Sequence, residues 1–171
     1  MFPLPGVIAQ LLWAPLGGGW GPGLLLLGLG ALLRFWAVGV ISARSRTRGD
    51  ETWEVARTGP YRRCRNPLYV GNVLMWAGLG LLSGPWVALA WVVVMGAEVS
   101  LIVRWEEANL LRQRGAAYAA YLQEVPRWGL PLPTPPLGPW SITEAVRGER
   151  STWLVAGGCL TLMFLRQQFS G

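Results

Sequence analysis

The chain has 171 residues, of which 52% are hydrophobic and only 14% are charged, and its formal net charge is +6. Soluble domains usually carry about 25% charged residues, so this composition disfavours a water-soluble domain, and its apolar content excludes a disordered chain. With no His, two cysteines and no Lys, the chain is expected to hold no metal and to use neither Ser-His, Cys-His nor lysine chemistry.

Three apolar stretches are expected to form membrane-spanning helices, since about 20 helical residues cross a hydrocarbon layer of ~30 Å. They are residues 21–41, 68–82 and 86–103. The turn Ser83-Gly84-Pro85 predicts that the second and third form a tight hairpin. Before them, residues 1–20 are interrupted by prolines and glycines, which indicates a segment on the membrane surface.

After the third stretch, apolar residues recur at three- and four-residue spacing over 105–125 and predict an amphipathic helix that ends before Pro126. A proline-rich connector follows, and Ser141 can cap a short helix before the last apolar segment. That segment, 152–165, is short for a span and predicts either a re-entrant helix or a short transmembrane helix. The expected fold is therefore all-α, a single polytopic integral membrane domain over residues 1–171.

Arginines predict the orientation of these helices. Residues 42–67 contain seven Arg, and Arg104, Arg112 and Arg114 follow the third span. Basic loops remain in the cytoplasm, so both regions are expected on the cytoplasmic face. This rule and anionic lipid headgroups account for the net charge, and no pattern typical of nucleic-acid binding is present.

The loop before the second span carries the first candidate site. Pro67 suits the first turn of a helix, which places Arg65, Asn66 and Tyr69 at the water–lipid boundary beside a helix N-terminus. Such a position favours anionic groups such as a carboxylate. A simple arginine-rich membrane anchor with an interfacial Tyr would show the same pattern, and both interpretations stay open.

A second candidate site lies at the end of the third span. Glu106 and Glu107 point about 100° apart on a helix, so one can face inward while the other pairs with the basic loop. Alternatively, they belong to a solvated helix start in which Glu107 pairs with Arg104. Because the hairpin brings the ends of its helices side by side, the two candidate sites are expected to meet.

Two charges within the apolar stretches need partners, because an unpaired charge in hydrocarbon costs a few kcal/mol. Arg34 and Glu98 lie at similar depths in their spans. An Arg34–Glu98 ion pair is therefore one expectation. The alternative is that either residue contacts a lipophilic substrate or a cofactor.

The order of several short motifs resembles a known superfamily. These motifs are Gly-Pro-Tyr-Arg, Arg-Asn-Pro-x-Tyr-x-Gly, Glu-Glu-x-x-Leu, Gly-x-x-Tyr-x-x-Tyr and Val-Pro-Arg, between Thr58 and Trp128. In this order they resemble the isoprenylcysteine carboxyl methyltransferase and phospholipid methyltransferase superfamily, integral-membrane enzymes that use S-adenosylmethionine. The resemblance implies a methyltransferase that acts on a membrane lipid amine or on a lipid-linked carboxylate or thiol.

The resemblance also implies roles for individual residues. Arg65, Asn66 and Glu106 are the implied catalytic residues. The implied cofactor-binding residues are Arg65, Asn66, Pro67, Tyr69, Gly78, Gly80, Glu106 and Glu107. The two glycines would let cofactor or substrate approach the second span, and Arg65 would meet the cofactor carboxylate. Arg34, Glu98 and Trp105 are expected at the substrate, with interfacial anchoring as the alternative for Trp105.

The chain departs from the superfamily pattern at two positions. Asn66 stands where many members have His, and Ile102 stands where the eukaryotic carboxyl methyltransferases often have Arg. Two other functions therefore remain open. One is a non-catalytic membrane scaffold or partner-binding subunit, and the other is a reductase that uses a nicotinamide cofactor on the same helical scaffold.

Overall fold

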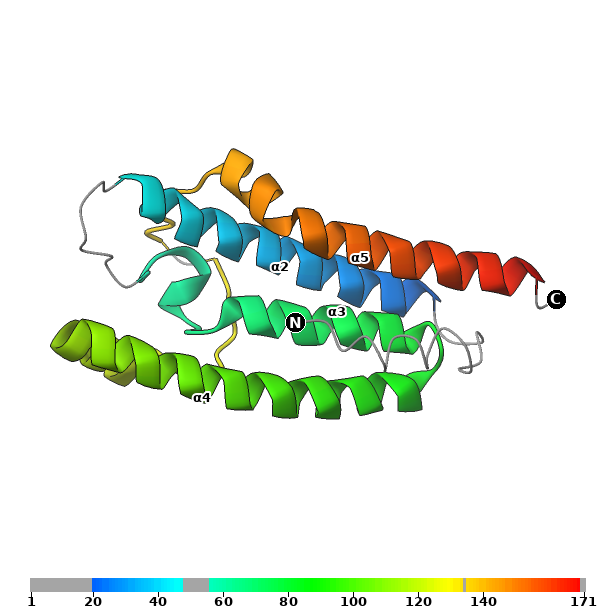
Figure 1. Ribbon diagram of the computed structural model, residues 1–171, viewed down its shortest axis with the longest axis horizontal. Helices are drawn as coiled ribbons and strands as arrows, with labels where there is room; N and C mark the ends of the chain where they lie inside the picture. The colour runs from blue at the N-terminus through cyan, green and yellow to red at the C-terminus, as the bar shows by residue number, and fades with distance from the viewer. Residues whose placement is uncertain (1–19, 48–55, 134, 170–171) are drawn as a thin grey trace.

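The computed structural model describes residues 20–47, 56–133 and 135–169. Helices are the only regular secondary structure of the described residues, which contain no strand, and this confirms the predicted all-α fold class. Its elements are α2 (Trp20–Thr47), the short 3-10 helix η1 (Gly59–Arg62), α3 (Pro67–Leu81), α4 (Pro85–Glu124) and α5 (Ile142–Phe169) (Figure 1). The surface segment expected over residues 1–20 lies outside the described residues except for Trp20.

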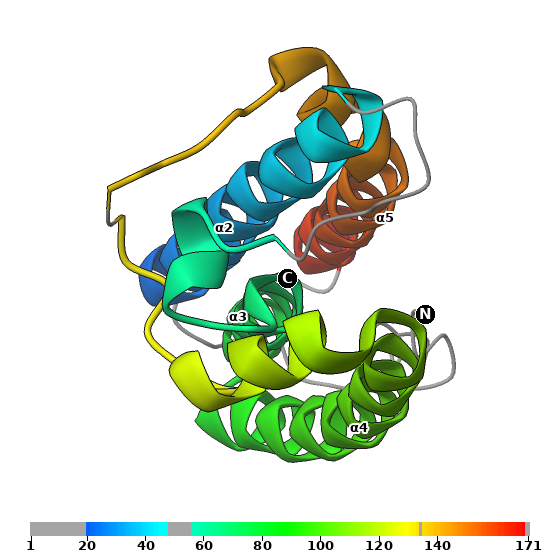
Figure 2. The same cartoon turned by 90° about the vertical axis from the view of Figure 1, so that its left-hand side faces the viewer.

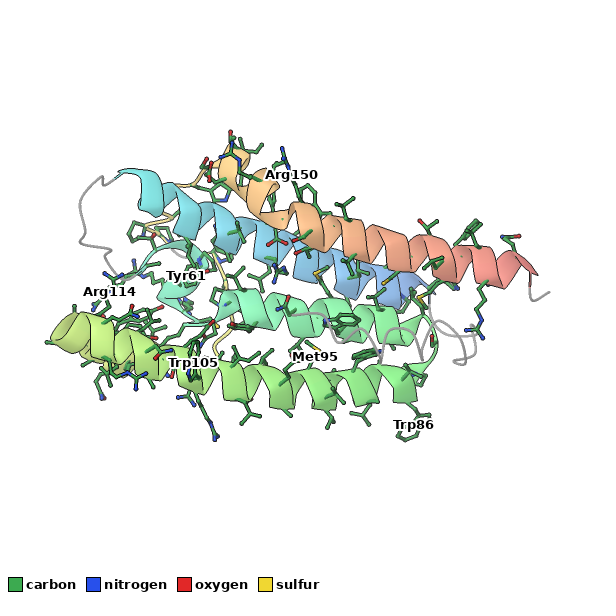
Figure 3. The ribbon with its side chains drawn as sticks, viewed as in Figure 1. Tyr61, Trp86, Met95, Trp105, Arg114 and Arg150 are labelled. Atoms are coloured by element: carbon green, nitrogen blue, oxygen red, sulfur yellow. The ribbon has the colours of Figure 1, made fainter. Side chains whose placement is uncertain are left out.

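The four long helices lie side by side along one axis (Figures 1 and 2). α3 packs against both α2 and α4, and α5 packs along α2. We call one end of this bundle the arginine-rich end, because Arg57, Arg62, Arg65 and Arg127 gather there beside η1. Figure 3 shows Arg114 and Tyr61 toward this end and Trp86 toward the opposite end, where α3 turns into α4.

Two pairs of glycines bring α2 and α3 together. Gly23 and Gly30 are seven residues apart on α2, as are Gly71 and Gly78 on α3, so each pair lies on one helix face. A Cβ added to Gly78 would lie 2.6 Å from the carbonyl oxygen of Gly23, and one added to Gly30 would lie 2.6 Å from that of Gly71. Small residues at these crossings allow the close backbone contact that is typical of membrane helices.

The bundle has an apolar interior and an apolar outside. Trp76 on α3 stacks on Trp91 on α4 with ring centroids 4.5 Å apart, at the centre of the largest buried cluster. Large apolar side chains also cover the outer faces of the helices, including Leu32, Val93 and Leu154. By length and composition, α2 and α4 are each able to cross a membrane. An apolar outer surface of this extent is the surface of an integral membrane protein.

The structure merges two predicted helices into one. Residues 86–103 and 105–125 both belong to α4, which is 40 residues long, because nothing between Val103 and Trp105 breaks a helix. The chain changes direction instead at Gly115, where φ is 51° and ψ is −129°. This backbone conformation strains any residue with a Cβ. The final turns of α4 therefore cross back over the arginine-rich end (Figure 2).

The last helix begins earlier than the apolar pattern indicates. α5 starts at Ile142, and the hydroxyl of Ser141 accepts a hydrogen bond of 3.4 Å from the backbone N–H of Glu144, which is the predicted cap. No separate short helix precedes the apolar segment 152–165, because α5 continues from Ile142 to Phe169 alongside α2. Whether 152–165 crosses the membrane stays a prediction.

Candidate functional site

The carboxylate of Glu107, on α4, is the centre of a polar cluster at the arginine-rich end. Its Oε1 accepts hydrogen bonds from Arg65 Nε at 3.0 Å and from Asn66 Nδ2 at 3.3 Å. Its Oε2 accepts from Arg127 Nη2 at 2.6 Å and Nε at 3.0 Å. Glu107 is only 6% exposed, so this carboxylate has exchanged water for two guanidinium groups and an amide.

Arg65 is held in place by the end of α4. Its backbone N–H donates to the carbonyl of Pro126 at 3.1 Å. Its Nη1 donates to the carbonyls of Leu122 at 2.8 Å and Val125 at 3.0 Å. The last carbonyls of a helix lack partners within the helix, so Arg65 satisfies them with a favourable positive charge. All three guanidinium nitrogens of Arg65 are then engaged within the protein.

The surrounding cations keep Glu107 ionised. Burial by itself would raise the pKa of Glu107, but the hydrogen bonds from Arg127 and the charge of Arg65 outweigh it, and the pKa lies below its usual value. A carboxylate with a lowered pKa is a poor proton acceptor at neutral pH. Glu107 is therefore suited to orient its neighbours and unsuited to act as a general base.

The neighbouring carboxylate faces a different partner. The hydroxyl of Tyr69, on the first turn of α3, donates to Glu106 Oε1 at 2.8 Å. Tyr69 is neutral, so this hydrogen bond does not balance the charge of Glu106. The second oxygen, Oε2, has no hydrogen-bond donor among the described residues. Glu106 therefore keeps one carboxylate oxygen available as an acceptor for a ligand.

Arg127 provides a positive charge in the same site as the Glu106 carboxylate. The cluster contains two guanidinium groups, those of Arg65 and Arg127, around the single carboxylate of Glu107. Arg127 uses Nε and Nη2 for Glu107, its side chain is 37% exposed, and its Nη1 has no acceptor among the described residues. Within the described residues, the site thus keeps a guanidinium donor at Arg127 Nη1 and a carboxylate acceptor at Glu106 Oε2, and both residues are linked to the cluster around Glu107.

Two buried tyrosines lie beside the site, Tyr61 packed against α2 and Tyr121 near the end of α4. The hydroxyl of Tyr121 donates to the carbonyl of Tyr61 at 2.7 Å, which ties the end of α4 to η1. The hydroxyl of Tyr61 is itself buried and has no hydrogen-bond partner in the described structure. Desolvation by this burial raises the pKa of Tyr61 well above its usual value, so Tyr61 remains neutral.

The structure brings together most of the residues expected at the cofactor. Arg65, Asn66 and Glu107 are in direct contact, and Tyr69 and Glu106 form a second contact beside them. Pro67 begins α3 directly after Asn66. The alternative Glu107–Arg104 pair is not formed, since Glu107 turns toward Arg65 and Arg127. Arg65 uses four of its five N–H donors within the protein, so its contact with a cofactor carboxylate stays a prediction that rests on one Nη2 hydrogen.

The roles expected of Gly78 and Gly80 are corrected. A Cβ on Gly80 would lie 2.6 Å from Cα of Ala88 on α4, and Gly78 faces the α2 backbone equally closely. A neighbouring helix occupies the space beside each glycine, so no cofactor or substrate approaches α3 there. Their function is helix packing.

The expected Arg34–Glu98 pair is wrong. Arg34 donates instead to Glu149 on α5, from Nη2 to Oε1 at 2.7 Å and from Nε to Oε2 at 3.0 Å. The sequence favoured Glu98 because it lies in its span at a depth similar to that of Arg34. Trp105 is 67% exposed on α4, as an interfacial anchor would be. The substrate roles of Glu98 and Trp105 stay predictions.

The sequence analysis did not identify Arg127, which binds Glu107, or Glu149, which binds Arg34. Arg127 lies in the Val-Pro-Arg motif, and that motif together with the unmatched positive charge was the available signal. Glu149 lies among alternating charges at the start of α5, a pattern that resembles an ordinary solvated helix start. Nothing in the local sequence distinguishes this buried carboxylate from the exposed charges around it.

Fold and site together define an integral membrane protein with a helical bundle and an Arg- and Glu-lined site at one end. The model of the family described as phospholipid methyltransferase matches residues 21–115, more than half of the chain. The chain belongs to this family. The matched part contains Arg65, Asn66, Tyr69 and both glutamates, whereas Arg127 and Glu149 lie beyond it.

A curated relative has a different activity. Over 79 residues the chain is 32% identical to steroid 5-alpha-reductase DET2 of Solanum lycopersicum, a match that covers 46% of this chain and 30% of the relative. The chain thus spans about a third of the length of that protein. No solved structure matches the chain significantly.

Proposed function

We propose that this protein is a membrane methyltransferase that moves a methyl group from S-adenosylmethionine to a lipophilic acceptor. The observation that carries the proposal is the pair of available charges in the site, Arg127 and Glu106. The methionine part of the cofactor has a carboxylate and an ammonium group on one carbon. Among the described residues, Arg127 Nη1 has no acceptor and Glu106 Oε2 has no donor, and this unused donor and acceptor match that charge pattern.

Each residue then has a defined task. Arg127 Nη1 is the donor for the cofactor carboxylate, and Glu106 Oε2 is the acceptor for its ammonium group. Arg65 and Asn66 are positioning residues, because they hold Glu107, which in turn fixes the guanidinium of Arg127. Tyr69 fixes Glu106 in the same way.

The cofactor supplies a methyl group on a positively charged sulfur, and its transfer requires alignment more than acid–base catalysis. A site without His and with an ionised Glu107 suits such a reaction. We expect the bound cofactor and acceptor, packed against the buried Tyr118 and Tyr121, to exclude water from the site. This favours a step in which a cation and an anionic nucleophile lose their charges together.

The acceptor is expected from the membrane. The site lies at the end of apolar helices, so the acceptor enters from the lipid and the cofactor from the aqueous side. From the arginine count, we expect that side to be the cytoplasm. A lipid amine and a lipid-linked carboxylate or thiol are the acceptor classes to test first.

The proposal is tested by calorimetry on the detergent-purified full chain with S-adenosylmethionine and with its demethylated product, S-adenosylhomocysteine. We expect binding that Arg127→Ala weakens by about tenfold or more, the value of a charged hydrogen bond. Arg112→Ala is the matched control, because Arg112 is exposed on α4 and contacts only Asn109 in the described structure. It should leave the affinity unchanged.

A reductase is the second candidate, favoured by the identity to the 5-alpha-reductase relative. A nicotinamide dinucleotide carries several phosphate charges, and the two carboxylates of Glu106 and Glu107 in the site suit them poorly. Binding of NADPH without binding of S-adenosylmethionine would replace the methyltransferase by the reductase. Binding of neither, in detergent and in lipid nanodiscs, would leave the non-catalytic scaffold.

A further inference from the structure

A second polar cluster lies between α2, α3 and α5. Besides its two bonds to Glu149, Arg34 donates from Nη2 to the hydroxyl oxygen of Thr152 at 3.2 Å and from Nη1 to the side-chain oxygen of Asn72. Glu149 is fully buried, and the side chain of Arg34 is 14% exposed. The cluster therefore connects three helices within the bundle.

The charges of this cluster are internally balanced. Both oxygens of Glu149 face nitrogens of Arg34, and all three nitrogens of Arg34 are engaged. The ion pair therefore has no net charge to offer a ligand. A phosphate or carboxylate brought to it would lose its water without gaining a counter-charge, which is strongly unfavourable.

Two hydrogen-bond donors remain unused beside the ion pair. Asn72 accepts from Arg34 through its oxygen, and its Nδ2 has no acceptor among the described residues. Thr152 accepts from Arg34, and its hydroxyl proton likewise has no acceptor in the described part of the chain. By contrast, Thr161 on the same helix donates to its own helix, to the carbonyl of Gly157 at 2.9 Å.

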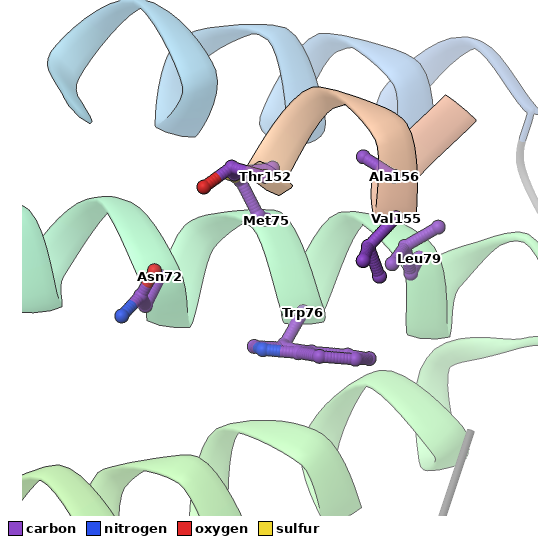
Figure 4. Close-up of a pocket in the computed structure, with 7 residues that line it drawn as sticks. All are labelled: Asn72, Met75, Trp76, Leu79, Thr152, Val155 and Ala156. Atoms are coloured by element: carbon purple, nitrogen blue, oxygen red, sulfur yellow. The ribbon is translucent and has the colours of Figure 1, made fainter. Parts of the chain in front are cut away.

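Both donors line one pocket between α3 and α5 (Figure 4). The other walls are apolar and include Met75, Trp76 and Val155. The cavity volume is about 10 Å³, close to the minimum that holds one water molecule. It has room for about one water-sized group, such as a single oxygen atom.

The pocket lies next to the candidate methyl-transfer site. Tyr69, which binds Glu106, and Asn72 are three residues apart on α3, so they share a face and are separated by about 4.5 Å along the helix axis. α3 runs away from the arginine-rich end, so the pocket lies one turn further into the apolar part of the bundle. If the reacting group of a lipid lies at Glu106, a group of that lipid about one helical turn away would lie at the depth of the pocket.

We propose that Asn72 and Thr152 bind an uncharged oxygen of the lipophilic acceptor, a carbonyl or a hydroxyl, and thereby select acceptors with such an oxygen near the reacting group. This inference rests on the proposed function, because that function is what makes the bound lipid a methyl acceptor. The pocket offers donors without net charge, which fits a carbonyl or hydroxyl oxygen. It offers neither the cation that a phosphate needs nor the carboxylate that an ammonium needs.

The test uses photocrosslinking of the full chain in lipid nanodiscs with a hexadecanol that carries a diazirine in its chain. Mass spectrometry should locate the label on α3 and α5 peptides beside the pocket. Unlabelled hexadecanol and a long-chain methyl ester should compete, the first as a hydroxyl and the second as an ester carbonyl, and the stronger competitor identifies the oxygen. Hexadecyl phosphate and hexadecylamine should compete about tenfold less well or worse.

Variants connect the labelling to the two donors. Thr152→Val and Asn72→Leu should each lower the labelling about tenfold, and Thr152→Ser, which keeps the hydroxyl, should restore it. Thr161→Val is the matched control, because its hydroxyl bonds within α5 and lies outside the pocket. It should label like the wild type. Size-exclusion profiles and melting temperatures must show that the compared variants are folded.

Two outcomes would overturn the inference. One is equal competition by the phosphate or the amine, and the other is labelling that persists in folded Thr152→Val protein. Calorimetry with S-adenosylmethionine separates this failure from that of the proposed function. Thr152→Val should bind the cofactor normally, and a wild type that labels in the pocket but binds no S-adenosylmethionine would refute the methyltransferase proposal alone.

Discussion

The Glu107 carboxylate accepts a 3.0 Å hydrogen bond from Nε of Arg65, although 42 residues separate the two in the chain. The contact exists because α3 begins just after Arg65 and the hairpin returns α4 to the same end. Arg127, from the connector after α4, completes the cluster. Three separate segments of chain are thus joined through one carboxylate, so its ionisation affects both the site and the fold.

Glu107 makes stability depend on pH in the acid range. Its pKa is lowered in the folded protein, so its ionic contribution is complete above the unfolded pKa of about 4.3 and is lost as pH falls through the folded pKa. We expect Glu107→Gln to lower the melting temperature in detergent by a constant amount from pH 8 to about pH 5. Below that range, the wild type should approach the variant.

Comparing the wild type with Glu107→Gln cancels the effect of the other carboxylates on the melting temperature, because both proteins contain them. A difference in melting temperature that stays constant down to pH 3 would contradict the assigned pairing of Glu107 with Arg65 and Arg127.

Tyr61 and Tyr121 provide a matched pair of hydroxyl deletions. The hydroxyl of Tyr61 is buried without a partner, whereas that of Tyr121 donates to the Tyr61 carbonyl at 2.7 Å. Tyr61→Phe should leave the free energy of unfolding unchanged or raise it by about 1 kcal/mol, and Tyr121→Phe should lower it by about 1 kcal/mol. Urea or thermal unfolding of both variants in one detergent measures the difference. Equal losses in the two variants would show that the Tyr61 hydroxyl has a partner.

The sequence predicted which residues would form the candidate site better than it predicted their individual bonds. Arg65, Asn66 and Glu107 could be placed together because hydrophobic length and a turn signal define a hairpin, and a hairpin aligns its ends. The bonds of Arg65 to the carbonyls of Leu122 and Val125 could not be predicted. They depend on the reversal at Gly115, which a glycine permits but does not specify.

Charge pairing within the bundle was harder to predict. Arg34 was matched with Glu98 because both lie at comparable depths in apolar stretches, yet pairing requires helices that touch. α5 packs along α2, and its first turns bring Glu149 to Arg34. The extent of α5 was hidden because its first ten residues mix polar and apolar side chains, so the sequence predicted a separate short helix there instead of the start of one long helix.

Glycines on α2 and α3 should differ in their tolerance of a methyl group. Gly78→Ala would bring a Cβ within 2.6 Å of the α2 backbone at Gly23, whereas a Cβ at Gly28 meets nothing within 4 Å. We expect Gly78→Ala to lower the free energy of unfolding by about 1–3 kcal/mol. Gly28→Ala should raise it by up to about 1 kcal/mol through helix propensity. Comparable melting temperatures for the two variants would contradict the close α2–α3 crossing.

The Arg34–Glu149 pair should dominate the attachment of α5. Removal of one partner leaves a buried charge without compensation, so Arg34→Met or Glu149→Leu should each cost about 3–5 kcal/mol of unfolding free energy. The double variant Arg34→Met/Glu149→Leu should be more stable than either single variant, because it leaves no buried charge.

Arg147→Met is the control on the same helix. Arg147 forms a pair with Glu144 at 3.4 Å and is 56% exposed, and its loss should cost less than about 0.5 kcal/mol. Thermal unfolding of the four variants in one detergent provides a double-mutant cycle. If the two single losses simply add in the double variant, the side chains do not interact, and α5 is held to α2 by its apolar contacts alone.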